Sequence, residues 1–194
     1  MNTTTSTADE ILACARSLIV SGGYNGFSYA DIAEVVGIRK PSIHHHFPSK
    51  ADLVETLVSR YLKEAEDGFS NLERAVPEPL DQLRTYIGHW KRCIGDETAP
   101  FCLCALLANE LPVLPEEVVV QVRAFFRLLS AWLASVFERG VAQGTLVLAN
   151  APGVEAEIFM ATVHGAMLSA RAYGDAGIFG TVMDPQLQRL LAKP

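Results

Sequence analysis

The sequence contains no run of about 18 uncharged apolar residues, the length that a helix needs to cross a bilayer. Its first residues, MNTTTSTADE, also lack the basic segment and apolar core of a secretory signal peptide. We therefore expect no membrane span, no membrane partner and a cytoplasmic location. In that reducing compartment the four cysteines are expected to be thiols.

Motifs of the common enzyme classes are also missing. The chain has no Gly-x-Ser-x-Gly elbow, no glycine-rich phosphate loop and no His-Glu-x-x-His zinc motif. Three consecutive histidines, residues 44–46, would diverge by about 100° each on a helix and so cannot share one ion. Cys102 and Cys104 would lie about 200° apart on a helix, which disfavours a joint zinc site. We expect no enzyme activity, no catalytic residue, no cofactor and no metal.

Positive charge is scarce in the chain as a whole but is concentrated in one segment. The sequence has 16 Lys and Arg against 22 Asp and Glu, a formal net charge of −6. Residues 38–50 nevertheless contain three basic residues, three histidines and no acid. An acidic chain is poorly suited to coating nucleic acid, whereas a small basic segment suits a local contact with phosphate.

The same region carries the start and stop signals of two short helices. Ser28 and Asp31 form a capping-box pattern, and Gly37 favours the left-handed conformation that ends a helix. A second helix is predicted over residues 39–46 and ends before Pro48. Two short helices joined by a glycine-containing turn are typical of the helix-turn-helix, which reads the DNA major groove. A helical hairpin with a solvated polar face is the alternative.

The segment GIRKPSIHHHFPSKADL, residues 37–53, resembles the signature of the TetR family of bacterial transcriptional regulators, of the AcrR-like helix-turn-helix type. In that family a recognition helix typically ends in Tyr-x-His-Phe, followed by Pro-Ser/Asn-Lys-x-x-Leu. His44 departs from this pattern, because the family usually has tyrosine there. The resemblance covers residues of about 7 to 60. The residues that match are Gly37, His46, Phe47, Pro48, Ser49, Lys50 and Leu53.

The resemblance implies that this region binds double-stranded operator DNA. Arg39 or Lys40 is the best candidate for a guanine contact, since cations bind the acceptors of guanine in the major groove. Lys50 and the backbone near Tyr29 are expected to bind phosphate at helix N-termini. The predicted DNA-binding residues are Ser28, Tyr29, Arg39, Lys40, Ser42, His44, His45 and Lys50.

The rest of the chain reads as helices, which predicts an all-α fold. A first helix is expected near Thr7, with Glu10 as its capping partner. We expect an N-terminal three-helix helix-turn-helix domain that binds DNA over residues 1–52. A larger helical domain over residues 53–194 is expected to bind an effector and to dimerise.

The C-terminal helices are apolar on more than one face, as between Phe125 and Phe137. The surplus apolar surface indicates a subunit interface or an internal cavity, and we expect both. The resemblance implies a homodimer through the last two helices, where Gly165 and Ala166 would allow close approach. The predicted effector-binding residues are Trp90, Cys93, Phe101, Cys102, Phe125, Trp132, Met160, His164 and Met167. A plain core role is the alternative for each of them.

These observations predict a DNA-binding repressor that releases a palindromic operator when a small apolar or electrophilic effector binds. One alternative is a thiol-based redox or electrophile sensor that acts through Cys102, which precedes a predicted helix. The other is a helical ligand-binding module that does not contact DNA.

Overall fold

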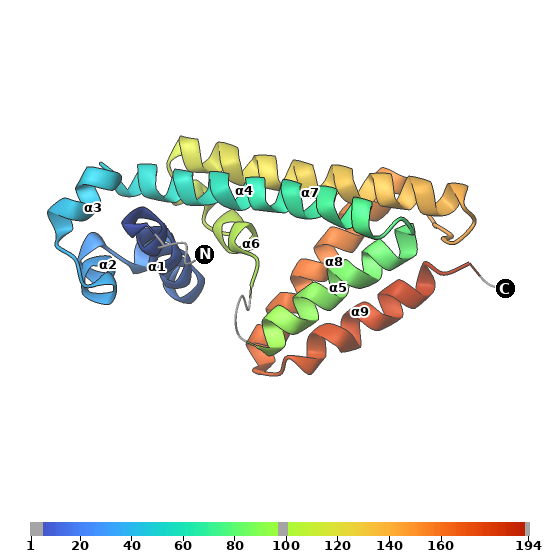
Figure 1. Cartoon of the computed structure of the whole chain (residues 1–194). Helices are drawn as coiled ribbons and strands as arrows, with labels where there is room; N and C mark the ends of the chain where they lie inside the picture. Colours follow the sequence, from blue (N-terminus) through green and yellow to red (C-terminus); the bar gives the residue numbers. More distant parts are fainter. Residues whose placement is uncertain (1–5, 97–100, 193–194) are drawn as a thin grey trace. The chain divides into compact units, whose positions relative to one another are not determined.

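The computed structural model describes residues 6–96 and 101–192. Over these residues the chain forms nine α-helices and two short 3-10 turns, and Leu146 and Leu191 form a lone antiparallel bridge (Figure 1). The predicted all-α class is confirmed. The elements are α1 (Thr7–Gly22), η1 (Tyr24–Gly26), α2 (Tyr29–Val36), α3 (Lys40–His46), α4 (Lys50–Ala75), α5 (Pro79–Gly95), α6 (Leu103–Ala108), η2 (Leu111–Val113), α7 (Glu116–Ala142), α8 (Pro152–Tyr173) and α9 (Gly177–Arg189).

The chain divides into two compact units, and two of the three divisions fall inside helices. The first unit contains the residues up to Glu64 together with Leu103–Phe125, and the second contains 65–102 and 126–194. Both α4 and α7 therefore contribute to each unit. The predicted boundary between residues 52 and 53 does not coincide with a division between these units, and it stays a prediction.

Apolar side chains of α1 form the centre of the first unit. Ile11, Ala15 and Ile19 recur at helical spacing and are fully buried. Around α1 lie α2, α3 and α6. The helices α2 and α3 have only eight and seven residues, so their stability depends on this packing.

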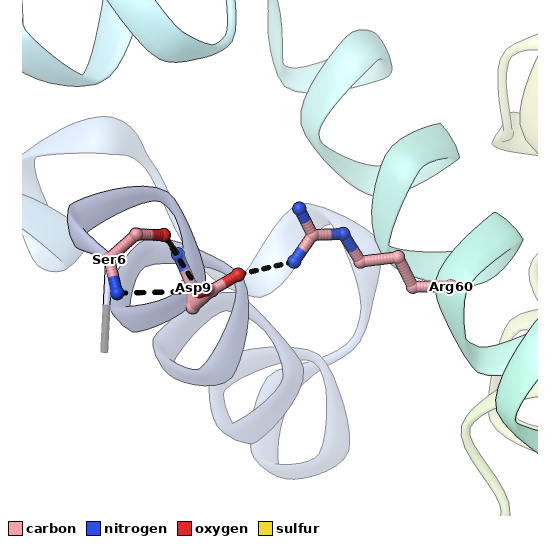
Figure 2. Close-up of polar contacts among 3 residues, drawn as sticks. All are labelled: Ser6, Asp9 and Arg60. Carbon is pink, nitrogen blue, oxygen red and sulfur yellow. Dashed lines mark hydrogen bonds and ion pairs between the residues drawn. The ribbon is translucent and has the colours of Figure 1, made fainter. Parts of the chain in front are cut away.

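The N-terminus of α1 is held by an exposed polar cluster (Figure 2). Ser6 caps the helix, and its hydroxyl donates to the Asp9 carboxylate at 2.7 Å. Arg60 of α4 forms an ion pair with the same carboxylate. The Ser6 hydrogen bonds, and then Arg60, lower the pKa of Asp9. The predicted capping pair, Thr7 and Glu10, was thus wrong by one residue, because Ser6 is the residue in the extended conformation that a cap requires.

The second unit is built around α8 and α9, which pack along each other, with α5 beside α9 (Figure 1). Phe137, Phe159 and Phe179 are fully buried, and the rings of Phe137 and Phe159 meet edge to face at 5.7 Å. Gly174 has a φ of +63° and ends α8 in the left-handed conformation. The turn that follows allows α9 to fold back on α8.

By length and composition alone, α7 could cross a membrane, which the sequence had not predicted. The core helix of a water-soluble protein can pass the same test. Leu129, Leu133, Val136 and Phe137 are buried at helical spacing along α7. Their burial inside the protein accounts for part of the apolar composition of this helix.

Candidate functional site

The predicted helix-turn-helix is present as α2 and α3. Ser28 caps α2, its hydroxyl accepting the Ala30 N–H at 3.2 Å, and the Asp31 carboxylate accepts the Ser28 N–H at 2.7 Å. Gly37 has a φ of +74°, and its N–H donates to the Ala33 carbonyl at the end of α2. The predicted caps therefore form, and they set where α2 begins and ends.

The helix α3 is anchored on one side and open on the other. Ile43 is fully buried, whereas Arg39, Lys40 and His45 are exposed and Ser42 is half-buried. Arg39 is the N-cap residue, in an extended conformation, with Lys40 at the first helical position. The solvent face of α3 therefore presents basic side chains and imidazoles, and their contact with DNA stays a prediction.

Tyr29 and His44 are partly engaged within the fold. The Tyr29 side chain is buried, and its hydroxyl donates to the Phe47 carbonyl at 2.9 Å. Burial, with Asp52 nearby, raises the pKa of Tyr29 to about 12. His44 Nδ1 lies 3.1 Å from the Pro48 carbonyl, and the imidazole contacts the Tyr29 ring at 4.7 Å between centroids. The Tyr29 side chain is therefore occupied within the fold, so a phosphate could bind only the Tyr29 backbone. The His44 ring is exposed, and its two contacts hold it in one orientation.

The Lys50 side chain is directed into the first compact unit, which we call the head. Its ammonium donates to the Phe27 carbonyl and lies 4.0 Å from the Phe27 ring centroid and 4.9 Å from that of Tyr24. Burial lowers the pKa of Lys50, and the charges of Asp31 and Glu110 oppose that change. The phosphate contact predicted for this side chain would have to compete with these internal contacts.

The predicted effector-binding residues do not all belong together. Phe125 lies in the first compact unit, where its ring is 5.2 Å from that of Tyr61. The others lie in the second unit, where Cys93 and His164 are only half-buried. The fully or almost fully buried members are Trp90, Phe101, Cys102, Trp132, Met160 and Met167.

Several aromatic side chains gather around Trp132 in the second unit. Phe69 stacks on Trp132 at 4.4 Å with the rings 7° from parallel, and Tyr86 lies 5.4 Å from Trp132. Burial, and then the charge of Cys102, raise the pKa of Tyr86, whereas a polar contact with the Trp90 indole lowers it. Sequence reasoning missed Phe69 and Tyr86, although Tyr86 and Trp90 are one helical turn apart on α5. We call Phe69, Tyr86, Trp90 and Trp132 the aromatic cluster.

Two buried donors of the aromatic cluster lack a well-formed hydrogen bond among the described residues. The indole N–H of Trp132 makes none, and that of Trp90 has only the nearby Tyr86 hydroxyl, whose pKa it lowers. A buried donor without a partner costs about 1–3 kcal/mol.

The cysteines differ in accessibility. Cys102, the predicted sensor, is fully buried, as is Cys104. Cys93 is half-buried, and its Sγ lies 3.6 Å from Nε2 of His89, one turn earlier on α5. Burial and then Arg92 lower the pKa of His89. A reagent would thus reach Cys93 more readily than Cys102, and a sensor role for Cys102 stays a prediction.

His164 is neutral at physiological pH. Its ring meets Phe126 edge to face at 5.4 Å between centroids, and burial lowers the pKa of His164 to about 4. An imidazole in this state can accept or donate one hydrogen bond without adding charge.

Acidification should destabilise the fold through His164. Between pH 6.5 and 4 the unfolded chain binds a proton that the folded chain excludes. The free energy of unfolding should therefore fall as pH falls through this range, by about 3 kcal/mol in total from this group. Urea unfolding of the wild type and His164→Gln at several pH values measures this, with the exposed His45→Gln as control. Parallel curves for the wild type and His164→Gln would contradict the prediction.

Comparisons with known proteins agree with this geometry. The family model described as "Bacterial regulatory proteins, tetR family" matches residues 11–57, which include α2, α3 and the first turns of α4. A crystal structure of a TetR-family transcriptional regulator from Agrobacterium tumefaciens is 65% identical, with a TM-score of 0.93, over 95% of this chain and 97% of that one. A TetR transcriptional regulator from Legionella pneumophila is 28% identical, with a TM-score of 0.87, over 98% of this chain and all of the other.

Curated relatives match over shorter stretches. The HTH-type transcriptional regulator EthR of Mycolicibacterium smegmatis is 26% identical over 137 residues, which are 70% of this chain and 63% of that protein. The HTH-type transcriptional repressor KstR2 of the same species is 29% identical over 75 residues, 39% of this chain and 37% of that protein. This chain thus covers less than two thirds of either relative.

Proposed function

Because this chain belongs to the TetR family of helix-turn-helix transcriptional regulators, we propose that it is a homodimeric repressor that binds a palindromic operator and releases it on binding a small effector. The observation that carries the proposal is the exposed basic face of α3, which is anchored behind by the buried Ile43. Because its apolar side is fixed in this way, α3 can insert into the major groove while it stays packed on the rest of the first compact unit. The same face argues against a helical module without DNA contact.

In this proposal the DNA contacts have distinct roles. Arg39 and Lys40 contact guanine or phosphate, and Ser42, His44 and His45 lie on the helix that enters the groove. Ser28 and the backbone of Tyr29, at the N-terminus of α2, bind phosphate. Lys50 adds positive charge at the first turn of α4, although its ammonium is directed to Phe27.

The exposed face of α8 supports the dimer. Val154, Ile158, Ala161, Gly165 and Leu168 follow one another at spacings of four and three residues, and all are exposed in one chain. Val154, Ile158 and Leu168 are 51%, 41% and 60% exposed. A Cβ at Gly165 would meet no other atom within 4 Å, so a second helix can approach closely there. A second copy of α8 would cover this apolar stripe about a two-fold axis.

The aromatic cluster supports an effector that is mainly apolar and carries a hydrogen-bond acceptor. Apolar rings with a few polar groups are typical of small-molecule sites, and the Trp90 and Trp132 indoles supply donors. An effector that binds one state of the protein better would shift the equilibrium toward it. Release of DNA follows if that state separates the two heads by a distance that no longer matches successive major grooves.

Neutralising the basic face should weaken DNA binding in a salt-dependent way. Lys40→Ala and Arg39→Ala should each lower the slope of log K against log salt by about one if the residue contacts phosphate. Fluorescence anisotropy with DNA from upstream of the protein's own gene, at several salt concentrations, measures the slope. Arg84→Ala, an exposed arginine of the second unit, is the control and should change nothing. Absence of any salt-sensitive, sequence-selective binding would favour the helical module without DNA function.

A charge on the stripe of α8 should separate the subunits. Leu168→Glu places two carboxylates in the proposed interface and removes two apolar side chains, which should weaken dimerisation on the order of 100-fold or more. Sedimentation equilibrium at micromolar concentration gives the mass. As a control, Val147→Glu replaces an exposed apolar residue of the second unit that lies outside α8, and it should leave the mass unchanged. A dimeric Leu168→Glu protein would move the interface elsewhere.

Removal of an indole donor should reduce the preference for acceptor-bearing ligands. We expect 2-acetylnaphthalene to raise the melting temperature more than 2-ethylnaphthalene, which has the same skeleton without the carbonyl. Trp90→Phe and Trp132→Phe remove the N–H donor and keep one aromatic ring, and at least one should weaken binding of the ketone relative to 2-ethylnaphthalene by about 3- to 10-fold, the worth of one hydrogen bond. Calorimetry on each variant gives the affinities. The same ketone preference in both variants and the wild type would exclude the indoles as the donors.

A further inference from the structure

Glu110, far from the helix-turn-helix in sequence, holds the backbone at the entrance to it. Both oxygens of its carboxylate accept the Tyr24 N–H, at 2.9 and 3.2 Å, although the two residues are 86 positions apart. Tyr24 begins η1, the short turn between α1 and α2. Both residues belong to the first compact unit.

The backbone of Glu110 is itself fixed on both sides. Its N–H donates to the Leu107 carbonyl at 2.9 Å, and its carbonyl accepts the Val113 N–H at 2.9 Å. Leu103 and Leu107 of α6 are fully buried, and α6 packs on α1. The carboxylate therefore extends from a rigid turn rather than from a flexible loop.

Gly23 meets this carboxylate closely. Its φ of +77° and ψ of −178° form a conformation that side chains disfavour. A Cβ at position 23 would also overlap the Glu110 carboxylate. The backbone conformation thus requires glycine at this position, and a Cβ there would displace the Glu110 carboxylate from Tyr24.

Tyr24 also contacts Lys50, through its aromatic ring. The Tyr24 ring lies 4.9 Å from the Lys50 ammonium, which donates to the Phe27 carbonyl at the far end of η1. The negative charge of Glu110 also favours the charged form of Lys50 against its burial. The first turn of α4 is therefore linked to Glu110 through Tyr24.

We propose that Glu110 is a positioning residue for DNA binding: it holds η1 at Tyr24 and so keeps Lys50 and the start of α4 in register with α2 and α3. Glu110 lies outside residues 11–57, the segment that matches the family model. The DNA-binding part of this inference rests on the proposed function, whereas the contact with Tyr24 does not.

The test compares Glu110→Ala with Glu110→Gln, which retains one acceptor oxygen, and with Glu116→Ala as an exposed control. In Glu110→Ala the Tyr24 amide should exchange with solvent at least about tenfold faster, measured by NMR. Lys50 should react faster with acetic anhydride, measured by mass spectrometry of its peptide. Affinity for the upstream DNA should fall about five- to tenfold, while Glu110→Gln restores a large part of all three properties and Glu116→Ala changes none.

A second variant checks that Gly23 and Glu110 act together. Gly23→Ala should weaken DNA binding in the wild-type background, and the loss should be smaller in Glu110→Ala, where the overlap with the carboxylate is removed. Equal losses in both backgrounds would contradict a direct contact.

Each remaining outcome is decisive. Unchanged Tyr24 exchange in Glu110→Ala overturns the contact itself. Faster exchange and faster Lys50 acetylation without a change in DNA affinity overturn its role in positioning the head for DNA. If the wild-type protein binds no DNA, the proposed function and the positioning role both fail, and amide exchange still decides whether Glu110 holds Tyr24.

Discussion

A helix of seven residues does not persist alone in water, so α3 exists because Ile43 is buried against the rest of the head. Tyr29 and Phe47, also buried, close the core on either side of it, and the Tyr29 hydroxyl holds the chain where α3 ends. This packing decides which side of α3 faces solvent. The basic face that the proposed function requires is therefore a consequence of the apolar face behind it.

The head is assembled from two separate stretches of the chain. Residues up to Glu64 supply α1 to α3 and the start of α4, and Leu103–Phe125 supply α6 and the start of α7. Polar contacts that join distant parts of this unit include Asp9 with Arg60, Tyr24 with Glu110, and Gln121 with Glu55. The Asp9–Arg60 ion pair is largely exposed and screened by solvent, so it contributes little to the stability of the unit. The buried side chains of α1 supply most of the stability of the unit.

Local features of the fold could be predicted from the sequence because local chemistry determines them. Ser28, Asp31 and Gly37 begin and end α2 as predicted, since a cap depends on neighbours three or four residues away. Choosing Ser6 rather than Thr7 as the first cap depends on backbone dihedral angles, which the pattern of polar residues does not contain. The direction of the Lys50 ammonium, and the engagement of Tyr29, depend on which carbonyl lies near, and that is a tertiary property.

The residues predicted to bind an effector also differ in how far the sequence determines them. Trp90 and Trp132 could be chosen from the sequence because large aromatics on helices are buried. The stacking of Phe69 on Trp132 joins α4 to α7, and no periodicity within one helix predicts such a pair. Phe125 shows the converse, since an aromatic side chain suited the predicted effector site, whereas in the structure Phe125 packs in the first unit.

The Tyr24–Glu110 contact also bears on the order in which the protein can fold during synthesis. The ribosome completes α1, α2 and α3 well before it reaches α6, so the growing chain exposes the side of α1 that α6 later covers. Until Glu110 is made, the Tyr24 N–H has only water as its acceptor. The head thus reaches its final packing only after α4, α5 and α6 have been translated. A nascent chain stalled before α6 would contain the residues of the helix-turn-helix but not the helix that packs against α1.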